Sequence, residues 1–360
     1  MKTKILVGIL ISFLLTNCDN KETSEDGVEL NCDIASRVFE GDLIFTTQTQ
    51  IDAFNNLGYA SIMGRVEING TNSGNDPVTT LNGALNCISF IEGGVKISNN
   101  NLLQNLEGFL TNVTSIAHLN IDNNDSLASL GGLDHLTSIT YYIAIHNNDL
   151  LTNLQGTPNN ITSTISLFIS ENDNLISLEG LNNLNSIENL NIENNPNLLD
   201  LKGLDALAHI DREINISHNE SLENIDALSS NINSTLEVVF IYDNFSLLSI
   251  KGLSNISTLN SLHIKKNNKL LNLEGLEDLN FANEFNRDGI YIEDNNSLEN
   301  VDALSNLIFV ISLYLTNNPN LSNYCGIEQL IISNSYVDVY INGNSYDPSV
   351  TDILNGFCSQ

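Results

Sequence analysis

The sequence predicts a β-solenoid, a parallel β-helix in which short strands from about twelve successive coils form one sheet. Two observations carry this prediction. Aliphatic residues recur every 23 to 25 residues over most of the chain, and an asparagine follows nearly all of them at a fixed distance. A fixed period of about 20 to 50 residues marks a repeat architecture, in which stacked coils bury one continuous core.

Each coil is predicted to contain a short strand that ends on an aliphatic residue, here called the anchor. A second aliphatic residue stands two positions before each anchor, an alternation typical of a strand with one buried face. The coils that end at Ile97 and Ile292 are longer than the others, and we expect their extra residues to loop out. The anchors are Ile68, Ile97, Ile121, Ile145, Ile169, Ile192, Ile216, Ile241, Ile264, Ile292, Leu315 and Ile341.

An asparagine stands three residues after every anchor except the first. Where the chain leaves the strand, backbone groups turn inward, and an asparagine can donate to and accept from its own turn and the next coil. We therefore predict a buried ladder of asparagines spaced about 4.8 Å apart. Its members are Asn100, Asn124, Asn148, Asn172, Asn195, Asn219, Asn244, Asn267, Asn295, Asn318 and Asn344.

Leucine and glycine recur in the rest of the coil. A leucine lies six residues after each anchor in ten successive coils, from Leu103 to Leu321. In most coils an aliphatic residue follows three positions later, and in eight coils a glycine follows two positions after that. We interpret the glycine as a tight corner with little room for a side chain.

Short capping helices are predicted at both ends of the solenoid. Residues 41–45 are predicted to form a first strand, and residues 47–50 form a capping box ahead of an amphipathic segment that ends at Gly58. This helix would plug the first coil. At the other end, Asp347 and Pro348 begin a last helix that carries Cys358 back to the solenoid.

Four cysteines follow Cys18: Cys32, Cys87, Cys325 and Cys358. An even number suits an oxidising compartment, and three pairings exist on paper. About nine coils, roughly 45 Å, separate Cys87 from Cys325 at ~4.8 Å per coil, whereas a disulfide needs Cα atoms within about 7 Å. The predicted pairs are therefore Cys32 with Cys87 and Cys325 with Cys358, one at each end of the solenoid.

The repeat resembles leucine-rich repeats, whose strand motif L-x-L-x-x-N it shares. It is more similar to the receptor L-domain type, over roughly residues 40 to 358. The resemblance implies a right-handed solenoid of the kind found in insulin-receptor-like ectodomains, fungal cell-wall proteins and bacterial surface lipoproteins. It also implies that the sheet face takes part in ligand binding. The longer coils that end at Ile97 and Ile292 depart from the pattern.

The N-terminal residues are predicted to be a targeting segment. Residues 1–17 have a basic start and a short apolar run, and residues 15–18 (LTNC) resemble the lipobox of bacterial lipoproteins, with Cys18 as the lipidated residue. Because Asn17 is larger than the usual residue there, an ordinary signal peptide is the alternative. We expect residues 18–31 to be a flexible tether and residues 32–360 to be the solenoid, held at the outer membrane by lipid and exposed at the cell surface. An acidic residue after such a cysteine elsewhere signals inner-membrane retention, so the choice of membrane stays open.

Charge and motifs argue against several functions. The formal charge of -31 argues against nucleic acid as a partner, since phosphate binding needs a basic face. We find no nucleophile elbow, phosphate loop or CxxC motif, and the six histidines fall at different repeat positions. We therefore expect no enzyme activity, cofactor or zinc site. Asp122 and Asp125 leave calcium as an alternative, but their spacing does not recur from coil to coil.

One column of side chains suggests a binding face. The residue directly before each anchor is predicted to point out of the sheet, and in the last five coils this residue carries a ring. Tyr242 would widen the patch. Two interpretations stay open: cross-strand stacking that stabilises the sheet by about 0.2 to 1 kcal/mol per pair, or a surface that binds protein or sugar rings. The residues of this column are Phe240, His263, Tyr291, Tyr314 and Tyr340.

The sequence thus favours a monomeric, non-catalytic recognition or adhesion lipoprotein. Its expected partners are the membrane, through the N-terminal lipid, and an extracellular protein or glycan. A glycan-binding accessory of a surface polysaccharide-uptake system is the main alternative, because it would differ only in what the rings contact. A polysaccharide-active enzyme on a β-helix is a weaker alternative, because it would need carboxylates or basic groups clustered on neighbouring coils.

Overall fold

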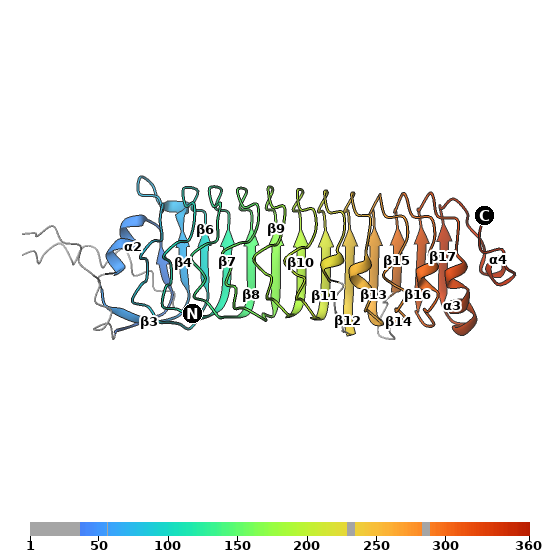
Figure 1. Cartoon of the computed structure of the whole chain (residues 1–360), viewed down its shortest axis with the longest axis horizontal. Helices are drawn as coiled ribbons and strands as arrows, with labels where there is room; N and C mark the ends of the chain where they lie inside the picture. The colour runs from blue at the N-terminus through green and yellow to red at the C-terminus, as the bar shows by residue number, and fades with distance from the viewer. Residues whose placement is uncertain (1–36, 56, 229–234, 283–288) are drawn as a thin grey trace, which may run out of the picture. The chain divides into compact units, whose positions relative to one another are not determined.

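The computed structural model describes residues 37–55, 57–228, 235–282 and 289–360 (Figure 1). The chain is a parallel β-solenoid of about twelve coils with little helix, as predicted. Two compact units make up the described chain, the first of residues 37–150 with 155–161 and the second of residues 151–154 with 162–360.

The first unit pairs its strands in parallel with the anchors directly opposite one another. Phe45 lies opposite Ile68, and Ile68 lies opposite Ile97. A smaller sheet flanks this one, with the order β1 (Arg37–Glu40), β3 (Tyr59–Met63) and β5 (Phe90–Ile91). Helix α2 spans Gln48–Asn55 and the 3₁₀-helix η2 spans Gly70–Asn72. The main sheet has the order β2 (Leu43–Phe45), β4 (Val66–Asn69), β6 (Val95–Ser98), β7 (Ser115–Asp122) and β8 (Ser138–His146).

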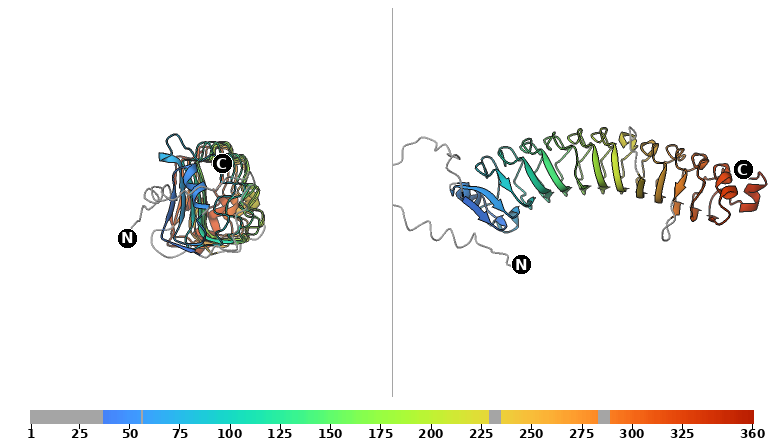
Figure 2. Two further views of the ribbon diagram at one scale, coloured as in Figure 1. Left: turned by 90° about the vertical axis from the view of Figure 1, so that its left-hand side faces the viewer. Right: turned by 90° about the horizontal axis from the view of Figure 1, so that it is seen from below.

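The second unit continues the same pattern, and its strands lie side by side along one wall of the coils (Figure 1 and Figure 2). Its sheet contains β9 (Ser166–Ser170), β10 (Ser186–Glu193), β11 (His209–Ser217), β12 (Thr235–Tyr242), β13 (Thr258–Lys265), β15 (Gly289–Glu293), β16 (Ser312–Thr316) and β17 (Asp338–Asn342), in that order, and β14 (Phe281–Ala282) pairs with β13. Its helical elements are η3 (Asp226–Leu228), η4 (Lys251–Leu253), η5 (Asp302–Leu304), η6 (Cys325–Ile327), α3 (Glu328–Ser333) and α4 (Val350–Leu354).

Aliphatic side chains from every coil fill the interior of each unit. The anchors from Ile68 to Leu315 are fully buried, and so are the leucines from Leu103 to Leu321. The last anchor, Ile341, is only half-buried. Glycine is required at the corners where coils approach closely: a Cβ at Gly132 would lie 1.9 Å from the carbonyl oxygen of Leu106. The period of the sequence therefore places both the core and the close contacts between coils.

The ladder asparagines lie in the interior and link successive coils. The backbone N–H of each donates to Oδ1 of the next asparagine at 2.8 to 3.2 Å, from Asn100 to Asn148 in the first unit and from Asn172 to Asn344 in the second. Asn195 also donates through Nδ2 to the carbonyl of Ile169 in the preceding coil (3.0 Å). Every ladder residue is at most 2% exposed except Asn344, which is half-buried.

Backbone conformation turns each ladder asparagine inward. The residue directly before it has a left-handed conformation in ten coils, with φ between 50° and 59°, from Asn99 to Asn317. Asparagine and aspartate adopt this conformation more readily than other residues with a side chain. Glu171, His218 and Lys266 occupy the same position, so the turn is imposed by the coil rather than by local preference.

The ladder has a defined first rung. In the preceding coil Thr71 takes the place of the asparagine, and Asn100 Oδ1 has no hydrogen-bond partner among the described residues. Gly70 lies against this oxygen, since a Cβ there would be 3.0 Å from it. At the other end, Asp347 accepts hydrogen bonds from the backbone N–H groups of Gly343 (2.9 Å) and Asn344 (3.1 Å) and so closes the last rung.

Helix α2 covers the first coil, with a cap that differs from the predicted one. Thr47 Oγ1 accepts the N–H of Gln50 (3.3 Å), as a capping box requires, but Gln50 Oε1 accepts the N–H of Thr46 (2.7 Å) rather than that of Thr47. The helix ends at Asn55, before the predicted Gly58, and buries Ile51 and Phe54. Gly58 has φ 68° and forms the turn into β3.

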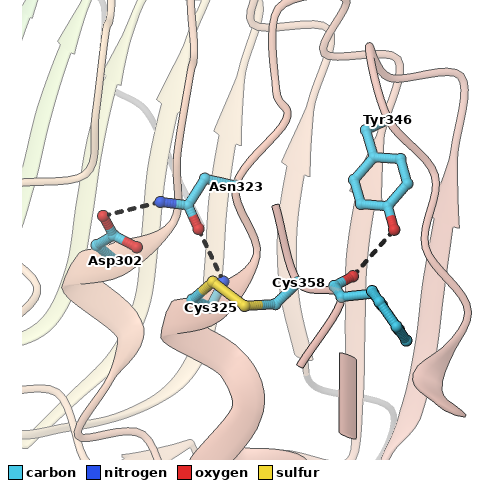
Figure 3. The surroundings of a disulfide bond; sticks show 6 residues. Asp302, Asn323, Cys325, Tyr346 and Cys358 are labelled. Atoms are coloured by element: carbon cyan, nitrogen blue, oxygen red, sulfur yellow. Dashed lines mark hydrogen bonds between the residues drawn. A yellow bond between two sulfur atoms is a disulfide. The ribbon is translucent and has the colours of Figure 1, made fainter. Parts of the chain in front are cut away.

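The C-terminal segment is tied to the solenoid by the predicted disulfide between Cys325 and Cys358, whose Cα atoms are 5.0 Å apart (Figure 3). Tyr346 donates its hydroxyl to the carbonyl of Phe357 (2.9 Å), which holds the same segment in place. Helix α4 begins at Val350 with Ser349 as its N-cap, slightly later than predicted. Cys87 is disulfide-bonded, and its predicted partner Cys32 lies outside the described residues.

Replacement of a ladder residue should destabilise the protein far more than replacement of a neighbour. In Asn195→Leu the buried N–H of Asn172 and the carbonyl of Ile169 lose their partner, so we expect a loss of about 3 kcal/mol or more. Asn197 donates only an exposed bond to the carbonyl of Asp173, so Asn197→Leu should cost less than about 1 kcal/mol. Thermal and urea unfolding measure the difference. Equal shifts for the two variants would contradict the assigned register.

Candidate functional site

Five neighbouring strands of the second unit each place one ring at the predicted outward position. In the parallel register Phe240 lies opposite His263, His263 opposite Tyr291, and Tyr291 opposite Tyr314, which lies opposite Tyr340. The centroids of successive rings are 4.9, 4.5, 4.7 and 4.4 Å apart. The last four rings are parallel to within 8°, and Phe240 is tilted by 36°. We call this set the ring column.

Stacking determines which parts of the rings face solvent. The inner rings have a neighbour on both faces and are half-buried, whereas Tyr340, the last ring, is 47% exposed. A ligand on the ring column would therefore meet ring edges and tyrosine hydroxyl groups rather than ring faces. The two end rings each have a face without a stacked ring: Phe240 lies opposite Asn215 on β11, and Tyr340 has no neighbouring ring on the side away from Tyr314. The sequence predicted the column but not this difference between its inner and terminal members.

The rows on either side of the ring column differ in character. On one side lie the small residues Ser261, Gly289 and Ser312, with Val238 and Asp338 at the two ends of this row, and Ser261 and Gly289 are buried. On the other side lie Tyr242, Lys265 and Glu293, followed by Thr316. Lys265 pairs with Glu293 (3.5 Å) and Asp294 (3.8 Å), so its charge is compensated. The surface is thus a flat strip of ring edges flanked by hydroxyl and carboxylate groups.

Tyr242 packs against the column as predicted from its position, with its ring centroid 5.5 Å from that of Phe240 and 6.1 Å from that of His263. Burial, with a smaller contribution from the Glu293 carboxylate, raises the pKa of Tyr242 to about 12. Burial also raises the pKa of Tyr314, and the neighbouring Tyr340 and Tyr291 act in the same direction. The hydroxyl groups of Tyr242 and Tyr314 therefore stay neutral donors and acceptors at physiological pH.

A hydrogen bond fixes the orientation of His263 within the column. Its Nε2 lies 2.8 Å from Ser261 Oγ, and Ser261 Oγ donates to the carbonyl of Gly289 (3.2 Å). Because a hydroxyl has one hydrogen, Nε2 is the donor in the bond to Ser261. The imidazole is stacked almost parallel to Tyr291, at an interplanar angle of 5°.

Outward positions elsewhere in the chain hold few rings. Polar residues such as Asn120, Asn191 and Asn215 take this place in other coils, and Phe168 in β9 is half-buried. Ala144 was also expected to face solvent, but it is only 3% exposed. At the position directly before the anchor, rings are therefore concentrated in the five strands of the ring column.

The histidines considered above as possible zinc ligands do not form one cluster. His118 stacks on Tyr142 in the first unit, with ring centroids 4.8 Å apart, and burial followed by the charge of Arg65 lowers its pKa. The stack needs a glycine beside it, since a Cβ at Gly94 would lie 2.2 Å from the His118 ring. Within the described ranges, no group of three His, Cys, Asp or Glu side chains is placed to hold a metal ion. Asp125, considered above for calcium, accepts a hydrogen bond from Asn101 (2.8 Å).

A second column of amides was missed by the sequence reasoning. Asn99 donates to Asn69 Oδ1 (3.3 Å), Asn123 donates to Asn99 Oδ1, and Asn147 donates to Asn123 Oδ1 (2.9 Å). Three of these residues occupy the left-handed position directly before the ladder. The signal was present in the sequence as paired asparagines, but only the second member of each pair recurs along the whole chain.

The sequence matches no protein-family model, and a search of curated proteins finds no relative. Within the part of the chain that the structure describes, no helix is long and apolar enough to span a membrane. Two of the predicted site residues, Cys18 and Cys32, lie outside the described residues.

The pKa of Tyr242 generates a test of the column's packing. The folded-state pKa is raised above the ordinary value of 10.0 to about 12, so this contribution to stability is complete below pH 10 and is lost as the pH rises toward 12. We expect the melting temperature of the native protein to fall more steeply over this interval than that of Tyr242→Phe. Thermal melts at stepped pH measure both slopes. Parallel slopes would show that Tyr242 is not buried in solution.

Proposed function

We propose that the protein is a non-catalytic, lipid-anchored recognition or adhesion protein that binds an extracellular ligand through the ring column. The observation that carries this proposal is the uninterrupted stack from Phe240 to Tyr340 on the outer face of the sheet. Tyrosines supply large, rigid contact area at low entropic cost, and they are enriched at binding hot spots.

The solenoid itself does not require these rings. Strands with asparagine at the same outward position, such as β10 and β11, pair with the same register and bury the same core. Stacked aromatic pairs are worth about 0.5 to 1.5 kcal/mol each, so the column also stabilises its strands. The rings are therefore additional to what strand pairing and burial of the core require.

A glycan is a second candidate ligand. The rings expose edges and hydroxyls rather than faces, and hydroxyl and carboxylate groups of Ser312, Thr316 and Glu293 lie in the neighbouring rows. These groups can donate to and accept from sugar hydroxyls. The same edges suit a protein surface, so the identity of the ligand is an outcome of the experiment below.

The test is a paired substitution within the column. We expect Tyr291→Ser with Tyr314→Ser to weaken binding by about 2 kcal/mol or more, roughly 30-fold in Kd, because two central hot-spot rings are lost. Residues 32–360, fluorescently labelled, would be screened on a glycan array and against extracted surface proteins, and the affinity for each hit would be measured for both forms.

The matched control is Asn191→Ser with Asn215→Ser, which changes the same outward position on strands without rings. This pair should retain full affinity. If the tyrosine pair also keeps full affinity but melts earlier, the column serves only to stabilise the sheet.

The lipid anchor has a separate test. If Cys18 is lipidated, Cys18→Ser should move the protein from the membrane fraction to the soluble fraction and abolish labelling by a palmitate analogue. Digestion by protease added to intact cells would then measure surface exposure of the native protein. Unchanged labelling of the variant would reject the lipobox assignment.

A further inference from the structure

The last strand of the second unit, β17, has one edge without a partner strand in the described sheet. Asp338 donates its N–H to Ile311 (2.9 Å) and Asn342 accepts from Asn317 (2.9 Å), so these residues bond toward β16. In a parallel strand alternate residues point their N–H and C=O groups to opposite sides. The groups of Val339 and Ile341 therefore point away from β16, and no hydrogen bond joins them to any other described residue.

Side chains at this edge are also incompletely covered. Leu313 and Leu315 on β16 are 0% exposed, whereas Val339 and Ile341, at the equivalent positions of β17, are only half-buried. Helix α4 packs against α3 and lies beyond β17 at the C-terminal end of the second unit (Figure 1). The open face of Tyr340 lies on the same edge.

Natural proteins usually protect such an edge with lysine, proline or a bulge, because an open strand invites pairing. Strand β17 reads DVYIN and contains neither lysine nor proline. It pairs with β16 in unbroken register over its five residues. The edge is thus regular enough to accept another strand.

The negative charge of the last coils indicates which kind of strand would bind at the β17 edge. From Gly289 to Gln360 the sequence has eight Asp or Glu residues and no Lys, Arg or His. Two copies joined edge to edge would bring two acidic ends together, which is unfavourable. A cationic segment would be attracted instead.

We propose that β17 binds an extended, cationic segment of a partner protein as an additional strand. Its backbone bonds to the N–H and C=O groups of Val339 and Ile341, its apolar side chains cover these two residues, and its Lys or Arg side chains face the acidic groups of the last coils. This is β-strand addition, in which backbone bonds supply affinity and alternate side chains supply specificity. The site is a strand edge and does not depend on the ligand of the ring column.

The probe is an octapeptide of alternating lysine and valine, with the same peptide N-methylated at alternate residues as its control, because methylation blocks bonding along one edge. Hydrogen exchange is read at the amides of Val339 and Ile341. We expect fast exchange in the free protein and at least tenfold slower exchange with the unmethylated peptide, with no change from the methylated one. Equal effects of both peptides, or no slowing at β17, would overturn the proposal.

A matched pair of variants tests the same bond. Val339→Pro removes one outward N–H at an edge position, where proline is tolerated, and should weaken peptide binding at least tenfold. Val339→Ala keeps the N–H and should change affinity less than twofold. Similar peptide affinities for the two variants would overturn the proposal. It would also be overturned if, without peptide, hydrogen exchange at β17 became slower as the protein concentration rose, because a second copy of the chain would then occupy the edge. If Val339→Pro does not fold, the methylated peptide decides. The Tyr291 and Tyr314 variant leaves β17 unchanged, so failure here is distinct from failure of the ring column.

Discussion

The hydrogen bond from the backbone of one ladder asparagine to the side chain of the next is the interaction on which the rest of the structure depends. It satisfies buried N–H and C=O groups at the point where each coil leaves the sheet, and an unpaired group there would cost about 1 to 3 kcal/mol. Because each rung also donates to the preceding coil, as Asn195 does to Ile169, it sets the register between neighbours. Everything that stacks in columns, from the core leucines to the rings, follows from that register.

Because the register between strands is fixed, a residue type that recurs at one outward position of successive coils forms a continuous row on the surface of the sheet. Rings at the outward position of five neighbouring strands stack at 4.4 to 4.9 Å because the ladder holds those strands in step. The same constraint leaves the inner rings with covered faces and gives Tyr340 and β17 a different exposure from their equivalents. Recognition in this protein is therefore expected along the strip and at its end, through different chemical groups.

Periodicity predicted the fold in detail, because strand, ladder and corner residues each recur at one position of the coil. The anchors, the buried asparagines and the Cys325–Cys358 bond could all be read in this way. Features that occur only once in the chain could not be predicted from the repeat. The burial of Ala144, the half-exposed Val339 and Ile341, and the cap of α2 at Thr46 depend on local packing at places where the repeat ends or changes. The left-handed turn before each rung was also missed, because residues as different as Lys266 and Asn317 adopt it.

The ladder has a direction as well as a register, and this limits how such a chain can change in length. Each rung gives its N–H to the following rung and its side-chain donor to the preceding coil, so every interior rung is interchangeable with every other. A whole coil can be gained or lost and the remaining rungs still match. Part of a coil cannot be gained or lost in this way, unless the extra residues leave the coil between one rung and the next strand. Evolution of this protein is thus expected to proceed by whole coils, with variation in length confined to one segment of each.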